Sequence, residues 1–172
     1  MQKYKIRKSE KGDIPGIMNI ISRNVEYFAK HDIPQWQWGY PNEDTFDQDI
    51  QAGNSYVLEA EGIVIATAAV IAKRDEDYDY IENGSWLNDE DYIVIHRIAV
   101  DPAYKGKGLA AKFLDFAREL AEKKGIRNLR VDTHQRNSSM DRFLRKNGFV
   151  PCGTVYIRKT DERIGYQKVL IE

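Results

Sequence analysis

The 172-residue sequence contains one cysteine, Cys152, five prolines and no long run of apolar residues. A single thiol excludes an internal disulfide and a zinc site built on several cysteines, and it is typical of a reducing compartment. The first residues, MQKYKIRKSEKGD, lack the apolar segment of a secretion signal, and no apolar run reaches membrane length. We therefore expect a cytoplasmic protein that needs neither a metal nor a membrane.

The sequence also lacks an excess of charge of one sign. It has 26 basic and 27 acidic residues, which gives a net charge of −1. No overall positive field therefore favours binding to nucleic acid or to an anionic membrane. Hydrophobic residues make up 42% and charged residues 31% of the chain, which is a globular composition. No repeat or linker divides the chain, so we expect a single domain over residues 1–172.

Hydrophobic periodicity predicts the element order β-α-α-β-β-β-α-β-α-β-β. Strands are expected at about 3–8, on both sides of a tight turn at Glu61-Gly62, at 92–100, at 126–134 and in a final hairpin around Thr160–Glu162. Helices are expected from a cap at Asp13 to about Lys30, near 43–52, from about Lys107 to Gly125, and from Asn137 or Ser138 to Gly148. The acidic segment 74–91 has no clear periodicity. The expected fold is α/β, with a six- to seven-stranded mixed sheet flanked by about four helices.

The stretch HRIAVDPAYKGKGLA, residues 96–110, joins a β-branched strand to a helix through a glycine-rich turn. Glycine permits a positive φ, and the following helix directs free N–H groups and its positive dipole end at the turn. Such a turn is suited to an anion, usually a phosphate. A Walker A loop requires Ser or Thr after Gly-Lys, whereas Gly108 follows Lys107, and the dinucleotide fingerprint requires a third glycine in an early βαβ unit. The alternative is a tight turn that binds nothing.

Two motifs together resemble the GCN5-related N-acetyltransferases, the GNAT superfamily. Residues 105–110 resemble the acetyl-CoA loop Gln/Arg-x-x-Gly-x-Gly/Ala, with a lysine in the first position. Residues 137–149 resemble the motif Asn-x-x-Ala/Met-x-x-Leu/Phe-Tyr-x-Lys-x-Gly-Phe. The resemblance covers nearly the whole chain in element order. It implies the GNAT fold and an enzyme that transfers the acetyl group of acetyl-CoA directly to a primary amine of a small molecule or a peptide N-terminus.

The resemblance also implies which residues hold acetyl-CoA. The pyrophosphate is expected on the amides of Lys105, Gly106, Lys107, Gly108, Leu109 and Ala110. The pantetheine is expected to pair with the strand backbone at Ile98, Ala99 and Val100, where an amide also polarises the thioester carbonyl, and to hydrogen-bond with Asn137. Basic residues gather between Lys123 and Lys146 and suit a 3′-phosphate, although a solvated helix face explains most of them.

Two histidines are candidates for the catalytic base. His96 has an intrinsic pKa near neutrality and, on strict strand alternation, shares a face with Ile98 and Val100. The arylalkylamine acetyltransferases of this superfamily are similar in carrying a histidine at this point. His134 ends the next predicted strand, with Asp132 on its face. The alternative for His96 is a half-buried structural histidine, and for His134 a cap on the turn into Asn137. The third histidine, His31, has no assigned role.

The tyrosine that serves many relatives as the general acid is replaced here by Leu144. Tyr156, Tyr104 or water are candidate replacements, or the thiolate leaves without assistance. Because this acid is missing, a catalytically weak or inactive CoA-binding module that acts through protein partners is an alternative function. A nucleotide-binding protein with another phosphate ligand is a second alternative. Cys152 has no evident base in the sequence and is expected to be a small core residue.

Aromatic residues 27–40 fall where relatives build the acceptor pocket, and of these we select Tyr27, Trp36 and Trp38 as acceptor-binding candidates. The alternative is that they attach this loop to the core. The acidic segment 74–91 has the charge to attract a polyamine or a basic peptide, although a mobile, solvated loop is the alternative. Relatives are often dimers, so a homodimer is a further expectation.

Overall fold

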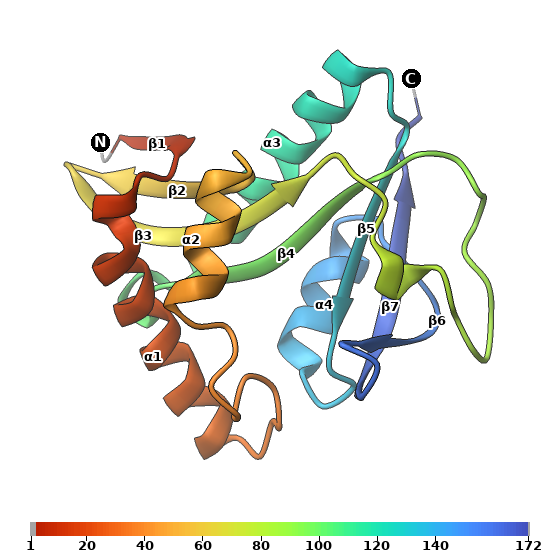
Figure 1. Ribbon diagram of the computed structural model, residues 1–172, viewed down its shortest axis with the longest axis horizontal. Coiled ribbons are helices and arrows are strands. Elements are labelled where there is room, and N and C mark those ends of the chain that lie inside the picture. The colour runs from red at the N-terminus through yellow and green to blue at the C-terminus, as the bar shows by residue number, and fades with distance from the viewer. Residues whose placement is uncertain (1–2, 172) are drawn as a thin grey trace. The chain divides into compact units, whose positions relative to one another are not determined.

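The computed structural model describes residues 3–171 and contains the predicted order of elements (Figure 1). The strands and helices are β1 (Tyr4–Lys8), α1 (Ile14–Lys30), α2 (Glu43–Gln51), β2 (Ser55–Ala60), β3 (Ile63–Ile71), β4 (Ile93–Val100), α3 (Leu109–Lys124), β5 (Asn128–Thr133), α4 (Ser138–Lys146), β6 (Val150–Ile157) and β7 (Asp161–Val169). Short 3₁₀ turns lie at Lys11–Asp13, Glu76–Tyr78 and Pro102–Tyr104.

The seven strands form one mixed sheet in the order β1-β2-β3-β4-β5-β7-β6. The pairs β1–β2, β2–β3, β5–β7 and β6–β7 are antiparallel, while β4 and β5 are parallel. The parallel register joins Ile93 to Leu129 and Val94 to Arg130, so the pairing uses the beginning of β4. The predicted α/β class with a seven-stranded mixed sheet and four helices is confirmed.

The chain forms two compact units, and the prediction of a single domain stays a prediction. The first unit contains the described residues up to Val70 together with His96–Leu114. The second contains Ile71–Ile95 and the described residues from Asp115 onward.

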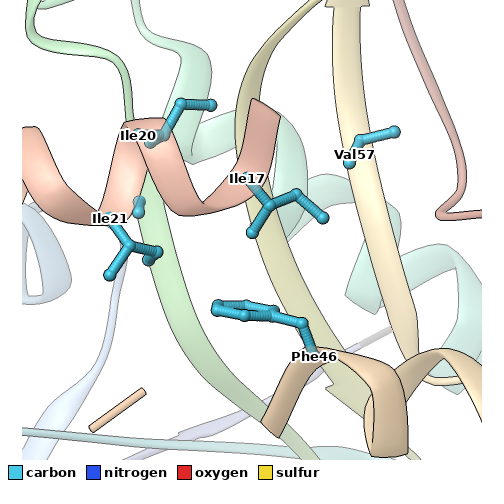
Figure 2. Packing of buried hydrophobic residues seen from close by; sticks show 6 residues of the cluster. Ile17, Ile20, Ile21, Phe46 and Val57 are labelled. Atoms are coloured by element: carbon cyan, nitrogen blue, oxygen red, sulfur yellow. The ribbon is translucent and has the colours of Figure 1, made fainter. Parts of the chain in front are cut away.

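The core of the first unit lies where α1 and α2 meet the sheet strands. Ile17, Ile20 and Ile21 of α1 form one buried cluster with Phe46 of α2 and Val57 of β2, and Figure 2 shows Ile17 and Ile21 on the side of the helix that faces Phe46. The three isoleucines recur at helical spacing, so one face of α1 is apolar and becomes buried. Ala99 of β4 belongs to the same cluster, so this core also fixes the strand that leads to the glycine-rich turn.

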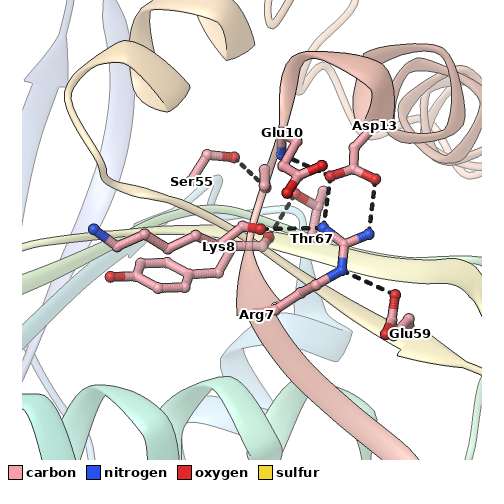
Figure 3. A network of polar contacts seen from close by, with 9 residues as sticks. Arg7, Lys8, Glu10, Asp13, Ser55, Glu59 and Thr67 are labelled. Atoms are coloured by element: carbon pink, nitrogen blue, oxygen red, sulfur yellow. Dashed lines mark hydrogen bonds and ion pairs between the residues drawn. The ribbon is translucent and has the colours of Figure 1, made fainter.

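An ion-pair network fixes the edge strand β1 in the same unit (Figure 3). Arg7 donates from both terminal nitrogens to the carboxylate of Asp13, at 2.8 and 2.9 Å, and from Nε to Glu59 of β2 at 2.9 Å. The Asp13 carboxylate also accepts from the backbone N–H of Glu10 at 2.7 Å. Asp13 is the N-cap residue of α1, as predicted, but its side chain makes no capping hydrogen bond to that helix and closes the preceding 3₁₀ turn instead.

The acidic segment 74–91 is partly a core element of the second unit. Tyr78 is buried and packs with Tyr92, Val94 and Val155, while the indole N–H of Trp86 donates to the Tyr78 carbonyl at 2.8 Å. Glu82 and Thr154 of β6 exchange two backbone hydrogen bonds, the N–H of each donating to the carbonyl of the other. The description of this segment as a solvated loop is therefore wrong for these residues, since two aromatic side chains anchor it.

The final hairpin turns slightly earlier than the sequence predicts. β6 ends at Ile157 and β7 begins at Asp161, so the turn covers 158–160 rather than Thr160–Glu162. Arg158 and Lys159 both have positive φ values, +55° and +67°. The sequence signal for this turn is weak because neither position is glycine, the residue that usually takes this conformation.

Candidate functional site

The glycine-rich turn has an open, left-handed backbone. Gly106 and Gly108 have φ values of +78° and +70°, and α3 begins directly afterwards at Leu109. A Cβ built on either glycine would meet no heavy atom within 4 Å. The turn therefore leaves space against its backbone at the N-terminus of α3, as an anion-binding site requires.

The approach to this turn is held by side chains of the first unit. The Asp101 carboxylate accepts from the backbone N–H of Ala103 at 2.9 Å and from the Arg23 guanidinium at 2.6 Å. The backbone N–H of Asp101 donates to the Ile65 carbonyl of β3 at 2.8 Å. These contacts attach the beginning of the turn to α1 and β3, so its entry is fixed.

The structure brings two predicted site residues, Lys105 and Tyr27, into contact. The Lys105 ammonium lies 3.3 Å from the centroid of the Tyr27 ring. The Tyr27 ring also stacks on His31, with centroids 4.0 Å apart, and meets Phe28 edge-on at 6.2 Å. Desolvation lowers the pKa of Lys105 in this position. Such a contact is a cation–π interaction, so Lys105 and Tyr27 join the turn to α1.

The strand β4 contains an irregular residue between the predicted base and the predicted pantetheine-binding residues. Arg97 has a φ of +55°, the left-handed region that non-glycine residues rarely adopt. His96 and Ile98 on either side are half-buried. Regular alternation along the strand is interrupted at Arg97, so alternation does not place His96 on the same face as Ile98 and Val100.

The side chain of Arg97 is held by a nearly buried ion pair. Its Nε and one terminal nitrogen bond the two oxygens of Asp49 in α2 at 2.9 and 2.7 Å. Its other terminal nitrogen donates to the Tyr40 hydroxyl at 2.9 Å. Burial opposes the charge on Arg97, but Tyr40 and Asp49 more than offset this and raise its pKa. Nearby, Asn24 of α1 donates to the Val100 carbonyl at 3.1 Å.

Sequence reasoning did not find Asp49 and Arg97. The available signal was a charged residue within the otherwise apolar run of IVIHRIAV. A charge inside a central strand requires a partner, but nothing in the sequence says that the partner lies 48 positions away in a short helix.

The second histidine candidate has a capping contact. Nδ1 of His134 accepts from the backbone N–H of Arg136 at 3.0 Å, which places the imidazole proton on Nε2. Burial, with Arg163 and Arg136, lowers the pKa of His134. A neutral ring with Nδ1 already accepting has no free lone pair for a substrate proton, so this geometry favours the capping alternative.

The predicted pantetheine residue Asn137 also has a structural role. Its side-chain carbonyl accepts from the backbone N–H of Met140 at 3.1 Å and caps α4. The prediction that Asn137 or Ser138 begins this helix is confirmed for Asn137. His134 and Asn137 both belong to the second unit, whereas His96, Lys105 and Tyr27 belong to the first.

The positions considered for the general acid differ in their surroundings. Leu144 is fully buried in α4 and is a core residue. The Tyr156 hydroxyl donates to the Glu82 carboxylate at 2.8 Å, and this hydrogen bond raises the pKa of Tyr156. Tyr104 lies beneath the Lys107 ammonium, 5.2 Å from ring centroid to nitrogen. Cys152 is buried, and burial raises the pKa of its thiol, as expected for a small core residue.

The two tryptophans proposed for the acceptor have different environments. Trp36 packs edge-on against Phe28 with ring centroids 5.5 Å apart and joins the core of the first unit. Trp38 is 75% exposed. The side chain of Trp36 thus attaches this loop to α1, whereas Trp38 is available to contact another molecule.

One pocket lies within the second unit, beside the acidic segment. Its volume is about 340 Å³, and it is lined by Ile71, Val94 and the charged residues 73–77.

None of the helices formed by the described residues has the length and apolar character that a membrane span requires.

Comparisons with known proteins agree with this fold. Residues 23–149 match the family model described as the acetyltransferase (GNAT) family. A GNAT-family acetyltransferase of Streptococcus agalactiae 2603 is 35% identical, with a TM-score of 0.87 over 98% of this chain and 96% of its own. No curated protein was found to match the sequence.

Two more distant solved structures share the fold and contain ligands. The PaiA N-acetyltransferase of Thermoplasma acidophilum, in complex with coenzyme A, is 18% identical, with a TM-score of 0.72 over 97% of this chain and 99% of its own. YncA of Salmonella typhimurium, with its cofactor acetyl-CoA, is 20% identical, with a TM-score of 0.68 over 98% of this chain and 95% of its own. With its family model and its 35% identical relative, the chain belongs to the GNAT family of acetyltransferases, which supports acetyl transfer in general.

Proposed function

We propose that this protein is an N-acetyltransferase that transfers the acetyl group of acetyl-CoA directly to a primary amine of a small molecule or a peptide N-terminus. The observation that carries the proposal is the turn at Gly106 and Gly108, with left-handed backbone, open space and a helix N-terminus behind it. Backbone N–H groups of residues 105–110 are suited to the pyrophosphate. The single buried cysteine is consistent with the cytoplasmic location, which stays a prediction.

The residues of β4 supply the next part of the proposed site. Ile98, Ala99 and Val100 follow the section of β4 that pairs with β5, so pantetheine is proposed to bind along this backbone. Asn24 of α1 donates to the Val100 carbonyl and so attaches this end of β4 to α1. An N–H group directed at the thioester oxygen would stabilise the negative charge that develops there during attack.

His96 is the proposed general base. Acetyl transfer forms a C–N bond and breaks the C–S bond of the thioester, and the attacking ammonium must first lose a proton. An imidazole can accept that proton near neutral pH. His134 is the weaker candidate, because its Nδ1 already accepts a backbone hydrogen bond. The thiolate is proposed to take its proton from water, since Leu144 offers none.

The acceptor is proposed to approach the first unit near the exposed Trp38, because an aromatic face attracts an amine in its protonated form. The alternative is a CoA-binding module without turnover, and the observation that favours it is the buried Leu144 at the usual tyrosine position. The two proposals differ in whether any amine is acetylated.

A panel of amines and peptide N-termini, assayed for thiol release from acetyl-CoA, tests the proposal. The wild-type protein should acetylate at least one class, whereas Gly108→Trp should lose both turnover and acetyl-CoA binding because the indole fills the turn. Gly62→Trp is the matched control, since Gly62 also has a positive φ, +78°, and no atom near its missing Cβ.

Gly62 lies in the β2–β3 turn, so its variant should suffer similar backbone strain and keep its activity. Acetyl-CoA binding without turnover on any amine would favour the inactive module. Full activity of Gly108→Trp would contradict the proposed role of the glycine-rich turn.

A further inference from the structure

The left-handed backbone at Arg97 is the least expected feature of β4. A non-glycine residue with a φ of +55° inside a strand is strained, and such strain persists only where surrounding contacts impose it. Strained residues of this kind concentrate at functional sites. Arg97 lies between His96 and Ile98, which are the proposed base and the first proposed pantetheine-binding residue.

Three hydrogen bonds hold the Arg97 side chain, and all lie within the first unit. Asp49 accepts from two nitrogens of Arg97, at 2.9 and 2.7 Å, and Tyr40 accepts a third hydrogen bond at 2.9 Å. The Arg97 and Asp49 side chains are only 10% and 12% exposed. A bidentate pair holds the planar guanidinium in one orientation, which in turn restrains the backbone that carries it.

We propose that Arg97 is a positioning residue, which Asp49 and Tyr40 hold so that β4 presents Ile98 and its neighbours to the pantetheine arm and thioester of acetyl-CoA. This inference rests on the proposed function. Through Tyr40, the same contact connects β4 to the aromatic loop that contains Trp36 and Trp38.

The proposal separates the two ends of acetyl-CoA. The nucleotide end is assigned to the glycine-rich turn and the pantetheine end to β4. The Arg97 side chain bonds Asp49 and Tyr40, which lie outside that turn. Loss of the Arg97 contacts should therefore weaken binding of acetyl-CoA but not of 3′-phosphoadenosine 5′-diphosphate, which has the pyrophosphate and lacks pantetheine. General instability would lower both affinities together.

The experiment is calorimetric titration of wild type, Asp49→Asn and Tyr40→Phe with both ligands. The quantity compared is the affinity for acetyl-CoA divided by the affinity for 3′-phosphoadenosine 5′-diphosphate. Asp49→Asn should lower this ratio about tenfold, because small displacements of positioned groups have large effects. Tyr40→Phe should lower it less, since one hydrogen bond of three is removed. Asp13→Asn is the matched control, because it disrupts the other bidentate ion pair of this unit, with Arg7 in β1 (Figure 3). Its ratio should equal that of wild type.

An unchanged ratio in both Asp49→Asn and Tyr40→Phe, with normal binding by wild type, would overturn this inference alone. A similar fall in Asp13→Asn would also overturn it, because the effect would then follow from lost stability. If wild type binds neither ligand, the proposed function fails and this inference fails with it. If Asp49→Asn does not fold, the Tyr40→Phe ratio decides, since that variant removes a single hydroxyl.

Discussion

His96 is a half-buried residue beside the strained position in β4, and its proposed role can be separated from acetyl-CoA binding. His96→Ala should lower turnover at neutral pH about 100-fold, the usual effect of losing a general base. The defect should become smaller at high pH, where the amine is already neutral. Acetyl-CoA affinity should change little, because the residue acts on the acceptor.

The measurement is the pH dependence of turnover for wild type and His96→Ala, together with acetyl-CoA titration of each. Wild-type turnover of the variant near neutral pH would make His96 a structural residue. An equal loss of affinity and turnover would mean that the substitution disturbs β4 rather than proton transfer.

Single residues also show which backbone conformations can be predicted from the sequence. Gly106 and Gly108 were predicted because glycine in a strand-to-helix turn has one dominant physical explanation, the need for a positive φ. Arg97 takes the same backbone region without being glycine, so its residue type does not mark this conformation. Its conformation depends on an ion pair with a residue distant in sequence, which periodicity does not detect.

Among the elements, the turn between β5 and α4 contains His134, which should make the stability of the protein depend on pH. Burial and two arginines lower the pKa of His134 below 6.5. The unfolded chain therefore binds this proton more readily than the folded chain. The stability that the neutral His134 ring contributes is fully present above pH 6.5 and is lost as the pH falls from 6.5 toward the folded pKa. His134→Asn should keep the capping hydrogen bond and lose this dependence on pH.

Urea unfolding between pH 7.5 and 5.5 measures the effect. Wild type should become less stable toward the lower pH, and His134→Asn should show a smaller slope of unfolding free energy against pH. Equal slopes for the two proteins would contradict a lowered pKa for His134. Turnover of the same variant would also test the remaining proposal that His134 has a catalytic role.

Elements were predicted well where one face is apolar and poorly where the chain is irregular. α1 shows a regular series of isoleucines, and both its ends lie near the predicted positions. The segment 74–91 lacks periodicity because its backbone is mostly irregular, yet Tyr78 and Trp86 anchor it in the second core. Burial of isolated aromatic residues leaves no repeating pattern, so the packing of this segment was missed.

At the scale of the whole molecule, element order and family membership agree. The predicted order of strands and helices, the seven-stranded mixed sheet and the match over residues 23–149 all lead to the same fold. Two further features of this chain are the Arg97–Asp49 ion pair and the buried Leu144. The proposed acceptor-binding residue Trp38 lies in a loop, where sequence patterns carry little information.

Binding of acetyl-CoA at the glycine-rich turn is the property on which the proposed function most directly depends. Calorimetric titration of the purified wild-type protein with acetyl-CoA, with ATP and NAD as controls, measures this. Selective binding of acetyl-CoA over both nucleotides is the predicted result, because ATP and NAD lack the pantetheine that β4 is proposed to bind. Absence of acetyl-CoA binding, or equal binding of ATP, would contradict the account.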